Sequence, residues 1–271
     1  MLDLHLALQF ANRAADDAGH IARAHFRRPI TVEHKSDDSP VTIADREIER
    51  VLRASIQAAY PDHGILGEEH GNLNVDREYV WVVDPIDGTK SFITGHPLFG
   101  GLMALLHDGK PALGQIDMPA LGERWCGIKG QDTTLNHVPV RTSTCTDLAS
   151  AYAYTTDPML FAAAFQPVFD LLHRSVRLLR YGGDCYSYAL LAAGHCDLVL
   201  ETGLQPYDYL PVVQIVRGAG GMISDWHGRD LGIGSTGNVL ASATPELHAK
   251  MLHELAQLRA TESGEKTALN H

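Results

Sequence analysis

The most informative chemistry in the chain lies in VWVVDPIDGTKSF (80–92), where an apolar strand pattern runs into two aspartates. Pro85 stiffens the turn and removes a backbone donor, so the Asp84 carboxylate, the Ile86 carbonyl and the Asp87 carboxylate can converge on one point. Oxygen ligands of this kind suit a hard cation such as Mg²⁺. An aspartate-rich turn closed by its own side chains would give the same pattern, so this segment alone does not decide.

The residues after Asp87 predict a binding site for an anion. Gly88 has no side chain, so its backbone can approach a ligand closely. We expect Thr89 to begin a short helix. The amides of Gly88 and Thr89 at the start of that helix, next to Asp87, would then bind a phosphate group.

Two further acidic positions complete the set of oxygen ligands. In GILGEEHG (64–71) Glu68 and Glu69 are adjacent, and their like charges repel unless a cation relieves one of them. In LQPYDYLP (204–211) Asp208 stands at a predicted helix start, where a first-turn acid that only caps the helix is the alternative. Glutamate, aspartates and one carbonyl suit Mg²⁺, and no histidine or cysteine spacing in the chain favours zinc.

Two helices are predicted ahead of these motifs. Apolar residues recur at helical spacing over residues 2–28. Thr42 and Asp45 form a capping-box pattern at the start of the second helix. The polar residues 34–41 predict a mobile loop, whose Lys35 either helps to close the site or is simply solvated.

The rest of the chain divides into two halves and a tail. From Tyr79 onward, short β-rich runs broken by glycine and proline predict an antiparallel sheet, so residues 1–140 form an α+β half with most metal and phosphate ligands. Helical and strand-like segments then alternate, which predicts an α/β half over 141–260 that completes the metal and substrate site. The polar, aperiodic residues 261–271 predict a flexible tail.

Composition argues against several classes of partner. The formal net charge of −11 opposes binding to nucleic acid or to an anionic membrane, because both reward clusters of Lys and Arg. The four cysteines form no CxxC pair, and the chain shows neither a signal peptide nor an apolar run of membrane-spanning length. We therefore expect reduced thiols and a cytoplasmic location. The net charge also repels a phosphate substrate, so bound metal or helix amides must supply local positive charge.

The motifs GEE (67–69), DPIDGT (84–89) and Asp208 ahead of VRGAGG (216–221) resemble, in this order, the inositol monophosphatase superfamily of Mg²⁺-dependent, lithium-sensitive phosphatases. The resemblance covers nearly the whole chain. It implies a layered αβαβα sandwich, a homodimer, and two to three Mg²⁺ ions per active site acting on a small phosphate monoester.

The resemblance also implies a role for each matching residue. The first ion would be bound by Glu68, Asp84 and the Ile86 carbonyl, the second by Asp84, Asp87 and Asp208, and a third would touch Glu68. Thr89 and Asp45 would orient the attacking water, with Glu68 also taking part in catalysis. The metal ions would polarise the phosphoryl group and activate water for in-line displacement, without a covalent enzyme intermediate. For Asp45, a purely structural role as the capping partner of Thr42 is the alternative.

Three segments look most like the histidinol-phosphate phosphatase branch of this superfamily: residues 84–109, 116–127 and 180–194. Lys90 with Phe92 also fits the nucleotide 3′-phosphatase branch, so DPIDGTKSF does not decide between them. Histidinol phosphate carries an amine and an imidazole, which acidic residues near the phosphate site would attract.

Two acids are the candidates for contacting the substrate. Glu201, seven residues before Asp208, matches the position of a substrate-contacting glutamate in the family. Asp184, in GGDCYSY, is the second candidate, and a helix N-cap for residues 185–194 is its structural alternative. Tyr207 stands where many family members carry tryptophan, so the resemblance does not define that wall of the substrate pocket.

The leading hypothesis is hydrolysis of L-histidinol phosphate in histidine biosynthesis. Inositol 1-phosphate or a 3′(2′),5′-bisphosphate nucleotide are the alternative substrates. A non-catalytic partner protein that binds metal or phosphate is the alternative of a different class. Asp45 and Thr89 argue against it, because a binding module has no need of a pair that activates water.

Overall fold

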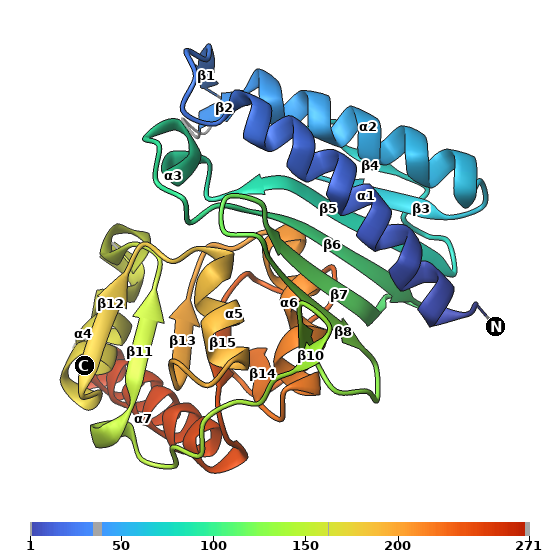
Figure 1. The fold of residues 1–271 in the computed structure, drawn as a ribbon. Helices are drawn as coiled ribbons and strands as arrows, with labels where there is room; N and C mark the ends of the chain where they lie inside the picture. The colour runs from blue at the N-terminus through green and yellow to red at the C-terminus, as the bar shows by residue number, and fades with distance from the viewer. Residues whose placement is uncertain (1, 35–39, 162, 269–271) are drawn as a thin grey trace.

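The computed structural model describes residues 2–34, 40–161 and 163–268. Helices and sheets alternate in five layers (Figure 1), which confirms the predicted αβαβα sandwich. Helices α1 (Leu4–His25) and α2 (Ile43–Ala59) form the first layer, and α5 (Cys185–Ala192) with α6 (Pro206–Gly218) forms the middle one. The last layer contains α4 (Gln166–Ser175) and α7 (Pro245–Ala268).

An eight-stranded sheet with the order β10-β9-β8-β7-β6-β5-β3-β4 separates the first layer from the middle one. All neighbouring strands pair antiparallel except β3 and β5, which run parallel. The strands are β3 (Gly64–Gly67), β4 (Asn72–Leu73), β5 (Tyr79–Asp87), β6 (Gly100–His107), β7 (Lys110–Met118), β8 (Glu123–Ile128), β9 (Thr134–Leu135) and β10 (Val138–Pro139).

A five-stranded sheet with the order β12-β11-β13-β15-β14 lies between the middle and last layers. It is mixed, because β11 pairs parallel with β12 and β13, whereas β15 pairs antiparallel with β13 and β14. The strands are β11 (Tyr152–Thr155), β12 (Leu178–Tyr181), β13 (Leu198–Glu201), β14 (Met222–Asp225) and β15 (Val239–Ser242).

Three hydrophobic cores fill the spaces between the layers. Strand β5 contributes to two of them, because its alternate side chains point to opposite faces of the sheet. Val80 and Val82 pack toward α5 and α6, whereas Trp81 and Val83 pack toward α1 and α2. Burial on both faces explains why β5 is apolar without alternation until it reaches Asp84.

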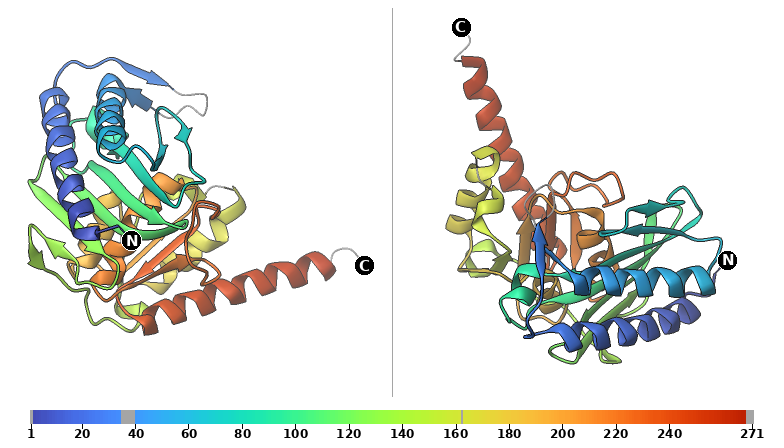
Figure 2. Two further views of the ribbon diagram at one scale, coloured as in Figure 1. Left: turned by 90° about the vertical axis from the view of Figure 1, so that its right-hand side faces the viewer. Right: turned by 90° about the horizontal axis from the view of Figure 1, so that it is seen from above.

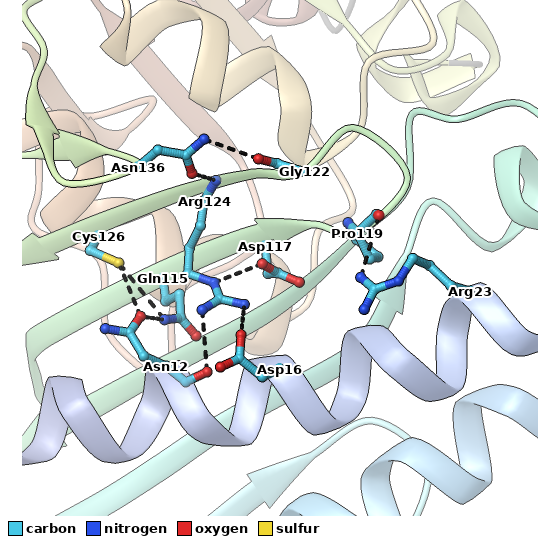
Figure 3. A network of polar contacts seen from close by, with 10 residues as sticks. All are labelled: Asn12, Asp16, Arg23, Gln115, Asp117, Pro119, Gly122, Arg124, Cys126 and Asn136. Atoms are coloured by element: carbon cyan, nitrogen blue, oxygen red, sulfur yellow. Dashed lines mark hydrogen bonds and ion pairs between the residues drawn. The ribbon is translucent and has the colours of Figure 1, made fainter.

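Polar contacts fix α1 to the large sheet (Figure 3). The Arg124 guanidinium, on β8, donates to Asp117 Oδ1 at 2.7 Å, to Asp16 Oδ1 at 2.8 Å and to the Asn12 carbonyl at 3.2 Å. Because Asp16 and Asn12 belong to α1, one side chain joins the first two layers. These contacts hold α1 against the sheet that contains β5.

The remaining elements are short or peripheral. Strands β1 (Val32–His34) and β2 (Pro40–Thr42) pair antiparallel. Residues 35–39 of the predicted mobile loop, Lys35 among them, lie outside the described residues. Helix α7 projects from the sandwich (Figure 2). It extends through residues 261–268, which the sequence assigns to an aperiodic tail. The flexibility of that tail stays a prediction. None of the helices in the part of the chain that the structure describes combines the length and the apolar composition that a membrane span needs.

Candidate active site

Three aspartates from two distant parts of the chain converge at the end of β5. Asp84, Asp87 and Asp208 each offer one carboxylate oxygen, and these oxygens all lie within 4.8 Å of one another. Asp84 is buried, and the other two are half-buried. Tertiary packing brings Asp208 there, because α6 packs directly against the strands β5, β6 and β7.

The backbone around Asp84 and Asp87 is bent by local hydrogen bonds. Strand β5 continues through both aspartates, and its register with β6 shifts between them. Asp84 Oδ1 accepts from the Ile86 amide at 3.1 Å, and the Thr89 hydroxyl donates to the Ile86 carbonyl at 3.1 Å. This irregular strand end brings both carboxylates and one carbonyl of DPIDGT to the same region, as the sequence predicts.

Gly88 connects this bend to the short helix α3 (Thr89–Ile93), as predicted. Its φ of 82° lies in the left-handed region that glycine adopts without strain. A Cβ at this position would lie 2.9 Å from Asp184 Oδ2 and 3.0 Å from the Leu98 carbonyl oxygen. Both conformation and space therefore require glycine.

Asp208 serves two roles at once. It is the third residue of α6, and its Oδ2 accepts from the Gln205 amide at 2.7 Å in a capping box. The charge of the same carboxyl group adds to the raised pKa of Asp84. The capping role expected as an alternative is thus compatible with membership of the carboxylate cluster.

Glu68 approaches the cluster from the turn after β3. It lies outside the compact group of three aspartates, but its charge adds to the effect of burial in raising the pKa of Asp84. Its charge also raises the pKa of Asp208 and of Asp45. The structure therefore brings all four predicted acidic metal ligands close enough for their charges to shift one another's pKa.

Burial and mutual repulsion make the ionised cluster costly. Burial, then the charges of Glu68, Asp87 and Asp208, raise the pKa of Asp84 well above its ordinary value. Burial, then Asp184 and Asp208, do the same for the pKa of Asp87. Burial is the main reason that the pKa of Asp208 is raised to about 7, and the charge of Glu68 adds to the shift. A bound divalent cation would reverse these shifts, and the all-oxygen donor set fits Mg²⁺.

Asp45 combines a structural bond with a free acceptor. Its Oδ2 accepts from the Thr42 amide at 2.8 Å and from the Thr42 hydroxyl at 2.5 Å, which is the predicted capping box of α2. Its Oδ1 is buried and has no hydrogen-bond partner among the described residues. Burial is the main reason that the pKa of Asp45 is raised. A buried acceptor without a partner usually has a functional reason or an ordered water beside it.

Beside the aspartates lies a cavity of about 60 Å³ whose lining includes both predicted substrate-contacting acids. Its walls are formed by Asp87, Thr156, Leu160, Asp184, Cys185, Tyr188, Glu201, Leu204 and Asp208.

Glu201 is held firmly in the wall of this cavity. It is buried, and its Oε1 accepts from the amide of Thr156 at 2.9 Å and, more closely, from the hydroxyl of that residue. Its Oε2 accepts from the Tyr188 hydroxyl at 2.8 Å. Sequence reasoning missed Thr156 and Tyr188, because no local pattern links them to Glu201.

Asp184 occupies the N-cap position of α5, but its side chain makes no capping bond. The proposed capping role of this side chain is therefore wrong. Asp87 takes that role, because its Oδ2 accepts from the Cys185 amide at 2.6 Å. The Asp184 backbone has a φ of 45°, and its Oδ2 accepts from the Ser91 hydroxyl at 3.3 Å. The carboxylate is thus turned toward α3 and the cavity.

Comparison with known proteins matches this arrangement to one family. The sequence profile of the Inositol monophosphatase family matches residues 3–260. The chain belongs to the inositol monophosphatase family. As a member, it is a phosphatase of phosphoric monoesters, and the fold predicted from the resemblance is the fold observed.

Relatives of this inositol monophosphatase family member carry different names. It is 45% identical to the bifunctional phosphatase IMPL2, chloroplastic, of Arabidopsis thaliana, over 90% of this chain and 73% of that protein. It is 38% identical to a histidinol-phosphatase of Chlorobaculum parvum, over 89% and 92% of the two chains. The solved structure of an inositol monophosphatase from Zymomonas mobilis superposes with a TM-score of 0.86 at 42% identity, covering 94% of this chain and all of that one.

Proposed function

We propose that this protein hydrolyses histidinol phosphate to histidinol and inorganic phosphate in a Mg²⁺-dependent reaction. The observation that carries the proposal is the acidic cavity directly beside the carboxylate cluster. Asp87, Asp184, Glu201 and Asp208 all line this cavity. With metal ions bound by Asp87 and Asp208, the acids Asp184 and Glu201 would remain to attract the cationic groups of a substrate whose phosphate lies at the metals.

Each residue of the cluster has a proposed part in binding the metal and the phosphate. Glu68, Asp84 and the Ile86 carbonyl would hold one ion, and Asp84, Asp87 and Asp208 a second. When bound, Mg²⁺ polarises the phosphoryl oxygens and lowers the pKa of a bound water. Asp87, Gly88 and Thr89 would bind the phosphate group between them.

Asp45 and Thr89 are the proposed residues that orient the attacking water. Asp45 Oδ1 is available as an acceptor, because the capping bonds use only Oδ2. The Thr89 hydroxyl donates its proton to the Ile86 carbonyl, which leaves its oxygen lone pairs free to accept from the water. Two acceptors of this kind hold a water in one orientation and draw its proton away from the phosphorus.

Asp184 and Glu201 are the proposed basis of substrate choice. Asp184 Oδ2 accepts from the Ser91 hydroxyl, and the carboxylate retains further acceptor sites for an ammonium or imidazolium group. Glu201 accepts from Tyr188 and Thr156, which orients its carboxylate rigidly beside the cavity. Inositol 1-phosphate is uncharged outside its phosphate and gains less from these acids than a cationic substrate does.

The test compares phosphate release in Mg²⁺ from histidinol phosphate, inositol 1-phosphate and a 3′-phosphorylated nucleotide. We expect the highest kcat/KM for histidinol phosphate. In Asp184→Asn, kcat/KM for that substrate should fall about 10- to 100-fold, the value of a lost charge-assisted hydrogen bond, with a smaller change for inositol 1-phosphate. A clear wild-type preference for either other substrate would refute the histidinol proposal. Metal binding without release from any ester would favour a non-catalytic partner protein instead.

We also infer a homodimer from the family resemblance. Light scattering at assay concentration should give twice the chain mass of 29.6 kDa. A monomeric mass would contradict this inference without affecting the proposed reaction.

A further inference from the structure

We propose that Glu49 of α2 is a positioning residue that fixes Glu68 for metal binding. This inference rests on the proposed function, because it takes Glu68 as a metal ligand. Glu49 is completely buried. It lies four residues after Asp45, so the two acids share one face of α2.

The carboxylate of Glu49 binds the turn that carries Glu68. Its Oε2 accepts from the Glu69 amide at 2.6 Å, and its Oε1 accepts from the His70 amide at 3.1 Å. These two amides follow Glu68 directly in the chain. Since the peptide unit is rigid, holding them fixes the direction in which the Glu68 side chain leaves the backbone.

Arg53 completes the clamp from the next turn of the same helix. Its Nε donates to Glu49 Oε1 at 2.7 Å, and its Nη2 donates to the Gly71 carbonyl. The turn after β3 is therefore held at both ends by an ion pair on α2. The ion pair also compensates the buried charge of Glu49, which would otherwise add to the repulsion among the acids nearby.

Gly67 shows how closely the clamp and the turn fit. A Cβ at this position would lie 2.3 Å from Glu49 Oε1 and 2.8 Å from Arg53 Nη2. The glycine of the GEE motif is thus explained by the clamp and not by a special backbone angle, because its φ is not positive. Helix α2 therefore contributes twice, with Asp45 as a proposed water-orienting acid and Glu49 as the support of a metal ligand.

The experiment measures Mg²⁺ binding by titration calorimetry and the Mg²⁺ dependence of phosphate release in Glu49→Gln. The variant keeps the size of the side chain but replaces one acceptor oxygen by a donor that faces an amide. We expect the Mg²⁺ dissociation constant to rise about 10- to 100-fold, as for other groups that orient metal ligands. Because Glu68 itself remains, kcat at saturating Mg²⁺ should largely recover.

Asp225 provides a matched control in the other sheet. It is also buried, and its carboxylate accepts from the His227 amide at 2.8 Å, the Arg229 amide at 2.9 Å and Arg229 Nε at 2.7 Å. Asp225→Asn removes an equivalent clamp that supports no metal ligand. Its Tm should fall as in Glu49→Gln, while its Mg²⁺ affinity stays at the wild-type value.

Wild-type Mg²⁺ affinity in folded Glu49→Gln, or equal losses of affinity in both variants, would overturn the inference. If Glu49→Gln does not fold, Arg53→Lys weakens the same clamp and should raise the dissociation constant by a smaller factor; an unchanged constant there overturns the inference as well. A wild-type protein that binds Mg²⁺ but releases no phosphate would refute the proposed function alone, because calorimetry still reports on Glu49.

Discussion

Asp208→Asn should stabilise the metal-free protein at alkaline pH while abolishing its response to Mg²⁺. The pKa of the Asp208 carboxyl is raised to about 7 from its ordinary value of 3.8, chiefly because the carboxyl group of this half-buried residue is withdrawn from water, and the charge of Glu68 adds to the shift. The folded state therefore binds a proton that the unfolded state releases between these values, so ionisation opposes folding as pH rises. The asparagine keeps an oxygen for the Gln205 amide, so the cap of α6 should survive.

The size of this effect follows from the shift. A difference of about three pKa units corresponds to about 4 kcal/mol of unfolding free energy at pH 8, where both states are ionised. Neutralising Asp208 relieves only part of a repulsion that Glu68 and Asp84 share. We therefore expect a gain of about 2 kcal/mol at pH 8, about half as much at pH 5, and none below pH 4.

Urea denaturation in EDTA at these pH values measures the gain directly. Mg²⁺ at about 100 times its dissociation constant should add about 2.7 kcal/mol to wild-type stability at pH 8 and almost nothing to that of the variant. The reasoning would be refuted by an Asp208→Asn protein that is less stable than wild type in EDTA at pH 8. It would equally be refuted if Mg²⁺ stabilised both proteins alike.

Three further predictions concern single side chains. Asp45→Asn should lower kcat roughly 100- to 10,000-fold, which is the range for a lost proton-transfer group. The Mg²⁺ affinity measured by calorimetry should change little. A near-normal kcat would show that Asp45 only caps α2. Gly88→Ala should cost about 1–2 kcal/mol of stability for its left-handed backbone, and the Cβ should displace Asp184 and raise KM for histidinol phosphate; an unchanged KM would show that Asp184 does not contact substrate. Burial lowers the pKa of His248 to about 4, so its contribution to stability is complete above pH 6.5 and is lost as pH falls toward 4, by about 3 kcal/mol at most. Between pH 6.5 and 4, the Tm of His248→Gln should fall less than the Tm of the wild type. Parallel curves of Tm against pH for the two proteins would contradict this.

Local patterns predicted the parts of the site whose geometry depends on neighbouring residues. The bend from Asp84 to Asp87, the left-handed Gly88 and the start of α3 are all made by contacts within a few residues. The cap of α2 by Asp45 is equally local. Asp208 was predicted as a metal ligand only in combination with the other acidic segments and the family resemblance, because nothing in its own segment distinguishes it from an ordinary first-turn acid.

Contacts between distant segments could not be predicted in this way. Asp87 caps α5 from another layer, so the Asp184 side chain binds Ser91 instead, although its position in the sequence suggests that it caps the helix itself. In the sequence, Glu49 is an acidic residue within a predicted amphipathic helix, and no local pattern marks it as a functional residue. Only the packing of α2 against the turn after β3 shows that it is completely buried and binds two amides there.

The sequence by itself determined the chemical type of this site, because an all-oxygen donor set and a glycine turn are properties of residue identity and local backbone geometry. Only the tertiary structure decided which acids share charge, which are held in place and which remain free. The physical reason is that the pKa of a carboxylate and the partners of its oxygens depend on burial and on groups brought near by the packing of layers. For Asp84 and Asp208, separated by more than 120 residues, α6 packed against β5 supplies that proximity.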